Sequence, residues 1–259
     1  MLRPLRVQVI DSAHVRFYLP NGRKHARRAS ESLSLKRMSP VAIGQVGIGY
    51  WGKNILRNLV SLPDARVVKA CDARPKVVAS LERSYPELTF TTAFDELLTD
   101  DRIEAVVIAT ETARHYEMAS AALRAGKHVF VEKPMARTAA QAAELVELSE
   151  RYDRRLMVGH LLLFHPAFRH VRARIQSGEL GDVYYLYSMR VNLGIVRERE
   201  NAFESLAPHD LSVALDFIDA RPRAVSADGE SCLQEGIEDV VFATVHFEDD
   251  RMAHLHTSW

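Results

Sequence analysis

Three glycines stand at the spacing Gly-x-Gly-x-x-Gly, at Gly47, Gly49 and Gly52. The apolar run at 41–46 before them predicts a short buried strand, and the apolar spacing after them is typical of a helix. Gly47 would allow a tight turn, Gly49 would let a pyrophosphate approach the backbone, and Gly52 would let the helix pack on the strand. Phosphates bind well at the free N–H groups of a helix start. The cofactor-binding residues expected in this turn are therefore Gly47, Ile48, Gly49, Tyr50, Trp51 and Gly52.

An acidic residue, Asp72, closes the next expected strand at 66–71, 20 residues beyond Gly52. A carboxylate in that place can accept hydrogen bonds from both hydroxyls of an adenosine ribose. Because a carboxylate repels a 2′-phosphate, Asp72 favours NAD over NADP as the cofactor. Arg74 keeps NADP as the alternative, since a nearby arginine can accommodate that phosphate.

Two further residues could move a proton during hydride transfer. Oxidation of a carbinol needs a group that takes the hydroxyl proton and one that stabilises the oxygen as charge develops. His209 is the expected base because imidazole titrates near neutrality. Lys133 follows the apolar run at 128–131 and is expected to hydrogen-bond the same hydroxyl and to share the base role. The structural alternatives are a solvated lysine and a packing or helix-capping histidine.

The segments around these residues alternate between strand and helix with short connections. Such alternation predicts a Rossmann-type, doubly wound α/β domain with a parallel sheet and helices on both faces. The expected strands are 41–46, 66–71, 89–90, 105–109, 128–131 and 155–158, and the clearest expected helices are 75–84, 113–125 and 138–152.

The pattern changes after Phe164. Helices are expected near 166–177 and 208–219, and strands near 183–191, 223–228, 239–247 and 252–259, the last two as a hairpin. We therefore expect a basic leader at 1–40 and a dinucleotide-binding domain at 41–162. A second α/β domain with a mainly antiparallel open sheet is expected at 163–259, cut short inside a strand.

The composition is that of a soluble globular chain, with 47% hydrophobic and 26% charged residues and no run long enough to span a bilayer. Two cysteines exclude a disulfide framework and fit the cytoplasm. Residues 1–38 hold nine lysines and arginines against two acids. They show no buried pattern, so we expect a dispensable leader or an early start codon, and no nucleic-acid or membrane partner. His246, His254 and His256 lack the company of a metal site, so no metal is expected.

The turn Glu132-Lys133-Pro134, together with the glycine turn, resembles the Gfo/Idh/MocA family of NAD(P)-dependent sugar oxidoreductases. Further segments resemble the branch that oxidises C3 of UDP-N-acetylglucosamine or its uronate. These are Gly159-His160, Phe164-His165-Pro166-Ala167, Asn192-Leu193-Gly194, Val196-Arg197 and Leu206-Ala207-Pro208-His209-Asp210. The likeness covers about residues 41–259. Ser205 departs from the family, which commonly has an aspartate there, so the supported pair is Lys133 and His209.

The resemblance implies a sugar or nucleotide-sugar substrate. It also implies a homo-oligomer formed through the second-domain sheet when that sheet is complete. It adds Thr110, His115, Glu132 and Lys133 as cofactor-binding candidates. The candidates for substrate binding are His160, His165, Asn192, Arg197, Asn201 and Asp210. Asp210 would either orient His209 or begin the helix that follows. The rival functions are an inositol or free-sugar dehydrogenase of the same family and a dinucleotide-binding fragment without catalysis.

Overall fold

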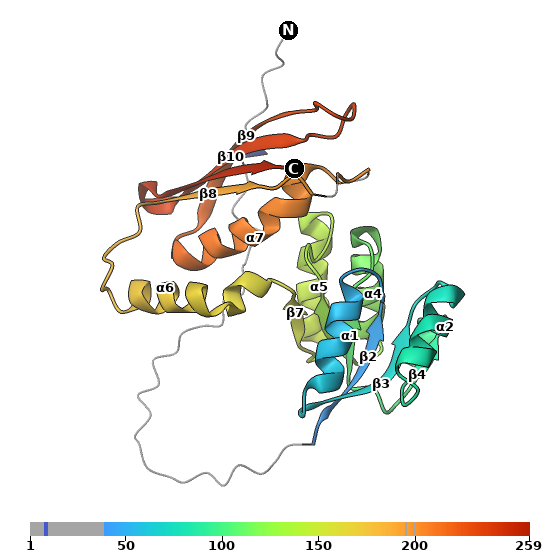
Figure 1. The fold of residues 1–259 in the computed structure, drawn as a ribbon. Helices are drawn as coiled ribbons and strands as arrows, with labels where there is room; N and C mark the ends of the chain where they lie inside the picture. The colour runs from blue at the N-terminus through green and yellow to red at the C-terminus, as the bar shows by residue number, and fades with distance from the viewer. Residues whose placement is uncertain (1–7, 10–38, 195, 199) are drawn as a thin grey trace, which may run out of the picture. The chain divides into compact units, whose positions relative to one another are not determined.

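The computed structural model describes residues 8–9, 39–194, 196–198 and 200–259 (Figure 1). The chain forms two compact units with a boundary between Gly159 and His160. The dinucleotide unit comprises the described residues from 39 to 159, and the second unit comprises 8–9 and the described residues from 160 onward. Most of the basic leader expected at 1–40, with the start expected near Met38, lies outside the described residues.

A parallel sheet of six strands forms the centre of the dinucleotide unit, in the order β4-β3-β2-β5-β6-β7. The doubly wound fold expected from the sequence is confirmed. Buried parallel strands are apolar along their whole length because helices cover both faces, and Val106 to Ile108 follow that rule. The strands are β2 (Val41–Val46), β3 (Ala65–Cys71), β4 (Thr89–Thr91), β5 (Ala105–Ile108), β6 (His128–Val131) and β7 (Leu156–Val158).

Two apolar cores lie against this sheet. One joins Leu56 of α1 and Leu81 of α2 to Ala70 of β3. The other joins Leu123 of α4 and Leu145 of α5 to the strands, which shows that helices cover both faces. Thr138 caps α5 by accepting a hydrogen bond from the Gln141 amide. The helices are α1 (Gly52–Ser61), α2 (Pro75–Ser84), α3 (Asp95–Leu98), α4 (Thr112–Arg124) and α5 (Ala139–Arg151).

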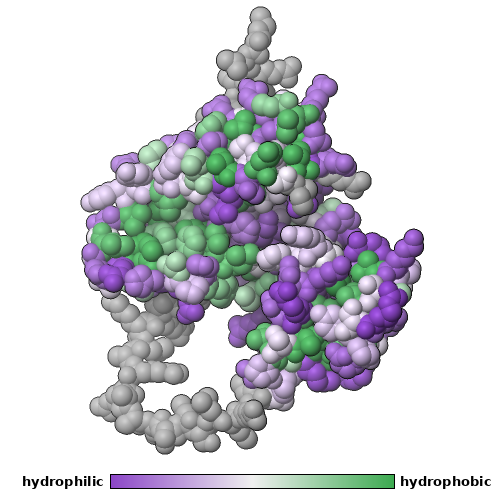
Figure 2. All heavy atoms as spheres, viewed as in Figure 1, coloured by the Kyte–Doolittle hydropathy of each residue, from purple (hydrophilic) through white to green (hydrophobic). Residues whose placement is uncertain are grey.

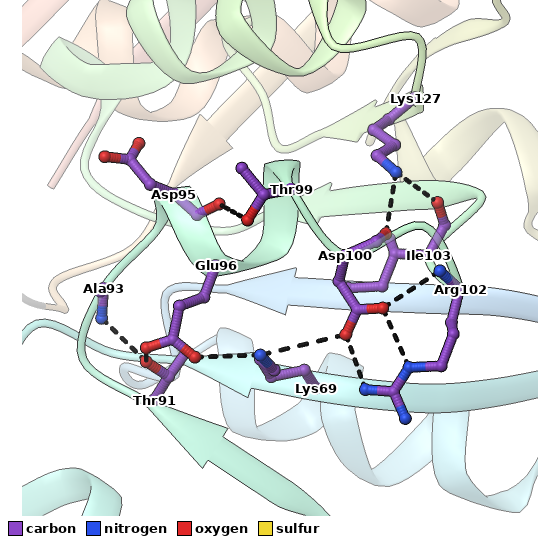
Figure 3. A network of polar contacts seen from close by, with 10 residues as sticks. All are labelled: Lys69, Thr91, Ala93, Asp95, Glu96, Thr99, Asp100, Arg102, Ile103 and Lys127. Atoms are coloured by element: carbon purple, nitrogen blue, oxygen red, sulfur yellow. Dashed lines mark hydrogen bonds and ion pairs between the residues drawn. The ribbon is translucent and has the colours of Figure 1, made fainter.

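The short helix α3, which the sequence did not predict, is held by a polar network (Figure 3). Lys69 of β3 pairs with Glu96 at 2.9 Å, and Glu96 also accepts the hydroxyl of Thr91 at 2.6 Å. The ammonium group of Lys127, just before β6, donates to the carbonyl oxygens of Asp100 and Ile103. The network therefore fixes the whole connection between β4 and β5.

The second unit contains a five-stranded sheet in the order β1-β9-β10-β11-β8. All neighbours are antiparallel except β11 and β8, so the mainly antiparallel sheet expected from the sequence is confirmed. The pair Gln8–Val9 was expected to carry no strand, yet it pairs with Val225 and Ala224 at the free edge of β9. The strands are β1 (Gln8–Val9), β8 (Tyr185–Val191), β9 (Pro222–Glu230), β10 (Val240–Phe247) and β11 (Met252–Ser258).

One face of this sheet is covered by α7. Ala214 and Ile218 pack there on Val245, Phe247 and Leu255. The helix begins earlier than the expected start near 208. The helical elements are η1 (Leu161–Phe164), α6 (Pro166–Gln176), α7 (Ala202–Phe217) and the short turn η2 (Glu248–Asp250) inside the β10–β11 hairpin.

The opposite sheet face is exposed and rich in aromatic residues and methionine. Met189 of β8 and Phe242 of β10 flank His256 of β11 in one cross-strand row, and Tyr187 stacks on His254 in the next. Tyr187 and Met189 are each 59% exposed. We call this row pair, with its neighbours Tyr185 and Met252, the open sheet face.

A second apolar area lies over the part of this unit that carries α6 and α7, as Figure 2 shows. Phe164 of η1 and Val171 of α6 have exposed side chains. No described residue of α6 is buried within the chain. Among the described residues, no helix combines the length and apolar character needed to cross a membrane.

Candidate functional site

The glycine turn lies between β2 and α1, and two of its glycines are required by the fold. Gly47 has a φ of +85°, and a Cβ atom there would lie 2.6 Å from the backbone of Ala109. A Cβ atom on Gly52 would overlap the carbonyl oxygen of Gly47. These residues close the turn against the end of β5, as the sequence predicts.

Gly49 has no such structural reason. Its φ is not in the left-handed region, and the nearest atom to a Cβ there would be Nη2 of Arg74, at 3.8 Å. An alanine would therefore fit the fold, but it would fill the open space above the turn. A glycine that the fold does not require is explained by a ligand that must reach the backbone. The turn thus fits the pyrophosphate of a dinucleotide.

Gln45 of β2 supports the glycine turn through side-chain hydrogen bonds, and it was not identified from the sequence. Its side chain is buried inside β2, and its Nε2 donates to the carbonyl oxygen of Gly52 at 2.8 Å and to that of Gly47 at 3.3 Å. A buried amide in an otherwise apolar strand was the available signal, because buried polar groups need hydrogen-bond partners.

Asp72 lies at the end of β3, where the sequence places the ribose-binding acid. Its carboxylate accepts the Ile48 amide at 2.9 Å and forms a two-pronged ion pair with Arg74 at 2.8 Å. Burial opposes ionisation of Asp72, but the hydrogen bonds from Arg74 and Ile48 outweigh it and lower the pKa of this carboxyl. Asp72 therefore stays charged and is fixed to the glycine turn.

The Glu132-Lys133-Pro134 turn follows β6 at the same carboxyl edge of the sheet. Glu132 accepts the indole N–H of Trp51 at 3.0 Å and the Lys133 amide at 3.2 Å. Burial raises the pKa of Glu132, despite the opposing effect of these hydrogen bonds and of nearby positive charge. Through Trp51, the side chain of Glu132 ties this turn to the glycine turn.

His115, expected to contact the cofactor, instead supports the Lys133 turn from inside the unit. It is only 1% exposed. Its Nδ1 lies 2.7 Å from the carbonyl oxygen of Pro134, and its Nε2 lies 3.1 Å from that of Thr110. Both ring nitrogens face the backbone, which leaves neither for a ligand. The structure thus gives His115 a positioning role, connecting the ends of β5 and β6.

The remaining cofactor candidates differ in what they expose. The side chain of Ile48 is fully buried in the α1–α2 core, so only its backbone is at the turn. Tyr50 is 85% exposed. Thr110 and Lys133 are half-buried at the carboxyl ends of β5 and β6. Both therefore stand at the edge where open α/β sheets bind ligands.

In the second unit, Asp210 does not begin a helix, which was one of the two roles that the sequence allowed. It lies inside α7, and its carboxylate binds the Ser188 hydroxyl at 2.8 Å and Arg190 at 2.6 and 3.0 Å. Asp210 therefore fastens α7 to β8 and does not begin the helix. His209 is half-buried in α7.

Two substrate candidates have local structural partners. Asn201 is the N-cap of α7, accepts the Glu204 amide at 2.8 Å and donates to Glu238 at 2.8 Å. His165 caps α6 by accepting the Ala167 amide at 3.2 Å. These contacts explain both residues without a ligand.

The other substrate candidates differ in their exposure. Asn192 and Arg197 are exposed in the connection between β8 and α7, and His160 is half-buried at the start of the second unit. His254 and His256 belong to the open sheet face. In the described ranges, no three histidine, cysteine or acidic side chains gather closely enough to hold a metal ion.

Comparison with known proteins is consistent with this geometry. Residues 41–160 match the family described as oxidoreductase family, NAD-binding Rossmann fold, and residues 168–259 match the GFO/IDH/MocA C-terminal domain. The structure resembles scyllo-inositol dehydrogenase from Lactobacillus casei with bound NAD(H) and scyllo-inositol. That likeness has a TM-score of 0.76 at 22% identity and covers 85% of this chain and 70% of that one.

The similar sequences include an uncharacterised oxidoreductase of Streptococcus pneumoniae, 26% identical, which matches over 83% of this chain and 62% of its own length. Inositol 2-dehydrogenase of Salmonella typhimurium is 30% identical and matches over 60% of this chain and 47% of its own length. The chain thus spans less than two thirds of either relative. The relatives do not single out the UDP-sugar branch that the sequence motifs suggested. With a dinucleotide turn, a fixed acid and both family domains in order, the chain belongs to the Gfo/Idh/MocA family of oxidoreductases with an NAD-binding Rossmann domain.

Proposed function

We propose that this chain takes part in the NAD-dependent oxidation of a secondary alcohol on a sugar or cyclitol ring. The observation that carries the proposal is the carboxyl edge of the six-stranded sheet. There the open glycine turn, the charged Asp72 and the Lys133 turn are tied into one assembly through Ile48 and Trp51. A rigid edge of this kind suits a cofactor and a proton-transfer group held in a fixed relation.

The reaction separates a hydride from a proton. NAD, held by the glycine turn and Asp72, would supply the acceptor for the carbinol hydrogen and its electron pair. The hydroxyl proton then needs a base, and the oxygen becomes the carbonyl oxygen of a ketone. We assign the uptake of that proton to Lys133 and His209, which act on the same hydroxyl. Lys133 also supplies positive charge as the alkoxide develops.

The substrate proposed first is a UDP-N-acetylhexosamine or its uronate, oxidised at C3. The motifs around His165, Arg197 and His209 support it. The exposed guanidinium of Arg197 suits a diphosphate, because arginine pairs with phosphate oxygens through two parallel hydrogen bonds. This proposal does not assign substrate binding to Asn201 or His165, because each side chain already caps a helix.

The second candidate substrate is inositol or a free sugar. The likeness to an inositol 2-dehydrogenase at 30% identity favours it. A free cyclitol has no diphosphate, so Arg197 would be irrelevant to its binding. Replacing Arg197 therefore separates the two candidates.

A substrate panel tests the proposal. NADH absorbance is followed with UDP-N-acetylglucosamine, its uronate, myo-inositol and scyllo-inositol, using the parent chain, Arg197→Ala, Lys133→Met and His209→Ala. We expect activity with a UDP-sugar, a raised KM in Arg197→Ala, and a loss of turnover of about 10²–10⁴-fold in each of the other two variants. Turnover with inositol alone would select the second candidate.

The double variant of Lys133 and His209 checks their shared role. If both groups serve one proton, the combined loss is smaller than the product of the two single losses. A fully multiplicative loss would assign them to separate steps. Near-parental turnover of His209→Ala from pH 6 to 9 would remove His209 from the mechanism.

We further propose that the chain is cytoplasmic and associates with its own copies through the open sheet face. Its two cysteines are free thiols, as expected in a reducing compartment. Exposed rows of tyrosine, methionine and phenylalanine are the kind of surface that protein partners cover.

A further inference from the structure

The loop between β9 and β10 is built around one carboxylate. Asp239 is only 5% exposed, and its Oδ2 accepts the amides of Cys232 at 2.7 Å and Leu233 at 2.6 Å. Its Oδ1 accepts the indole N–H of Trp259, the residue after β11, at 2.7 Å. The Leu233 amide above all, with Trp259 and the Cys232 amide, holds the pKa of Asp239 below its ordinary value, although burial opposes this. Asp239 therefore stays charged and fixes the loop at 231–238 to the end of β11.

This loop in turn holds the connection between β8 and α7, which carries Arg197. Nε2 of Gln234 donates to the carbonyl oxygen of Arg197 at 3.0 Å. The carboxylate of Glu238 accepts the side-chain amide of Asn201 at 2.8 Å, and its carbonyl oxygen accepts the Ala202 amide at 2.9 Å. Both side-chain contacts join residues 37 positions apart, so they connect two separate segments of the fold.

The contact from Gln234 reaches the backbone of Arg197 and leaves the guanidinium to extend from it. The contact lies at the surface, where water can satisfy a carbonyl oxygen, and ordering a glutamine side chain costs conformational entropy. What the contact provides is a fixed place for the peptide group between Arg197 and Glu198. A fixed backbone reduces the freedom that Arg197 must lose when its guanidinium binds an anion.

We propose that Gln234 is a positioning residue for the substrate: it fixes the backbone at Arg197 so that the guanidinium meets the diphosphate of a nucleotide sugar. The inference rests on the UDP-sugar proposed above as the first candidate substrate. Gln234 acts through Arg197, so its effect on affinity disappears when the guanidinium is removed.

Calorimetric titration of the full chain with UDP-N-acetylglucosamine in the presence of NADH tests the proposal. The two ligands cannot react with each other, because both are in their reduced form. Gln234→Ala removes the side chain, and Gln234→Met keeps its length but has no N–H donor. We expect each to weaken the binding of UDP-N-acetylglucosamine by about 3- to 10-fold, which is the loss of one hydrogen bond.

The same substitutions in the Arg197→Ala background separate positioning from general damage. We expect Gln234→Met to cause no further loss there, because the group that it positions is gone. Leu233→Ala removes a 63% exposed side chain from the same loop and keeps the amide that Asp239 binds, so it should leave the affinity unchanged. Thermal unfolding of each variant shows whether it is folded.

A backbone measurement checks the hold on Arg197 without any ligand. The amide of Glu198 belongs to the peptide group whose carbonyl oxygen Gln234 binds. We expect its NMR order parameter to fall in Gln234→Met from the range of rigid backbone, about 0.85, toward that of flexible backbone, below about 0.6. An unchanged order parameter would overturn the proposal.

The remaining outcomes distinguish this inference from the proposed function. Parental affinity in both Gln234 variants, with weaker binding in Arg197→Ala, would overturn the inference and leave the proposed substrate standing. An equal loss from Gln234→Met in both backgrounds would also overturn it, because Gln234 would then act independently of Arg197. Failure of the parent to bind UDP-N-acetylglucosamine, or full affinity in Arg197→Ala, would overturn the proposed diphosphate contact and this inference with it.

Discussion

Glu132 is half-buried, and its two hydrogen bonds join two functional turns. Burial raises the pKa of Glu132 above the ordinary value for a glutamate. Since the unfolded chain ionises this group more readily, the folded state gains from its protonated form. Its contribution to stability is therefore fully present below the ordinary pKa of glutamate and is lost as the pH rises through the raised value.

Replacing Glu132 with glutamine should make the free energy of unfolding less dependent on pH in that window. The amide keeps an acceptor for Trp51 and removes the need to bury a charge. We expect the stability of Glu132→Gln relative to the parent to improve from pH 4 to pH 8, measured by urea unfolding. Glu87→Gln, an exposed site in the same unit, should show no such trend. A relative stability that falls with rising pH would show that the buried carboxylate is stabilising.

His115 offers a second test of what a single side chain contributes to stability. Phenylalanine fills a similar volume but has no N–H, so His115→Phe leaves at least one of the two partly buried carbonyl oxygens, of Thr110 or Pro134, without its donor. An unsatisfied buried acceptor costs about 1–3 kcal/mol. We expect a loss of that size in chemical unfolding and a partial recovery in His115→Gln, which carries an amide donor. Parental stability of His115→Phe would mean that these contacts contribute little.

At the scale of elements, α7 begins earlier than the sequence suggested because a capping box precedes it. The sequence suggested a helix from about 208. Asn201 and Glu204 form a reciprocal capping box instead, and the helix runs through Pro208.

Asn201 therefore has a test that separates capping from substrate binding. Asn201→Ala should lower the free energy of unfolding by about 1 kcal/mol, because N-cap side chains contribute that much. Asn201→Ser keeps a capping oxygen and should restore most of the loss. If instead both variants keep parental stability and both raise the KM for the sugar, Asn201 is a substrate ligand.

Regular elements were predictable where a local pattern decides them. β5 follows from its apolar run, α5 from the Thr138 cap, and the glycine turn from its spacing. The connection held by Lys69, Glu96 and Lys127 was not predictable, because those side chains meet only after the strands are placed. The roles of Asp210 and His115 were missed for the same reason: their partners are distant in sequence. The ion pair of Arg74 with Asp72 was also missed, although the two residues lie only two positions apart in the sequence.

At the scale of the whole molecule, the open sheet face makes an oligomer testable. A lysine in place of Met189 or Phe242 would put a charge in the centre of any interface formed there. We expect Met189→Lys and Phe242→Lys to shift the sedimentation of the chain toward smaller species. Leu193→Lys changes an 84% exposed residue outside the sheet and should leave sedimentation unchanged. Equal sedimentation of all four proteins would place self-association elsewhere or exclude it.

The pairing of Gln8 with Val225 joins residues separated by about two hundred positions, with the entire dinucleotide unit between them in sequence. During synthesis, β1 leaves the ribosome first, but β9 and β10 are made only near the end. The Rossmann sheet, whose strands all lie between 41 and 158, has every partner it needs long before then. Domains generally fold as units during synthesis, and distant pairings form slowly. Docking of β1 is therefore a late event, and until it occurs the edge of β9 is open to strands of other nascent chains.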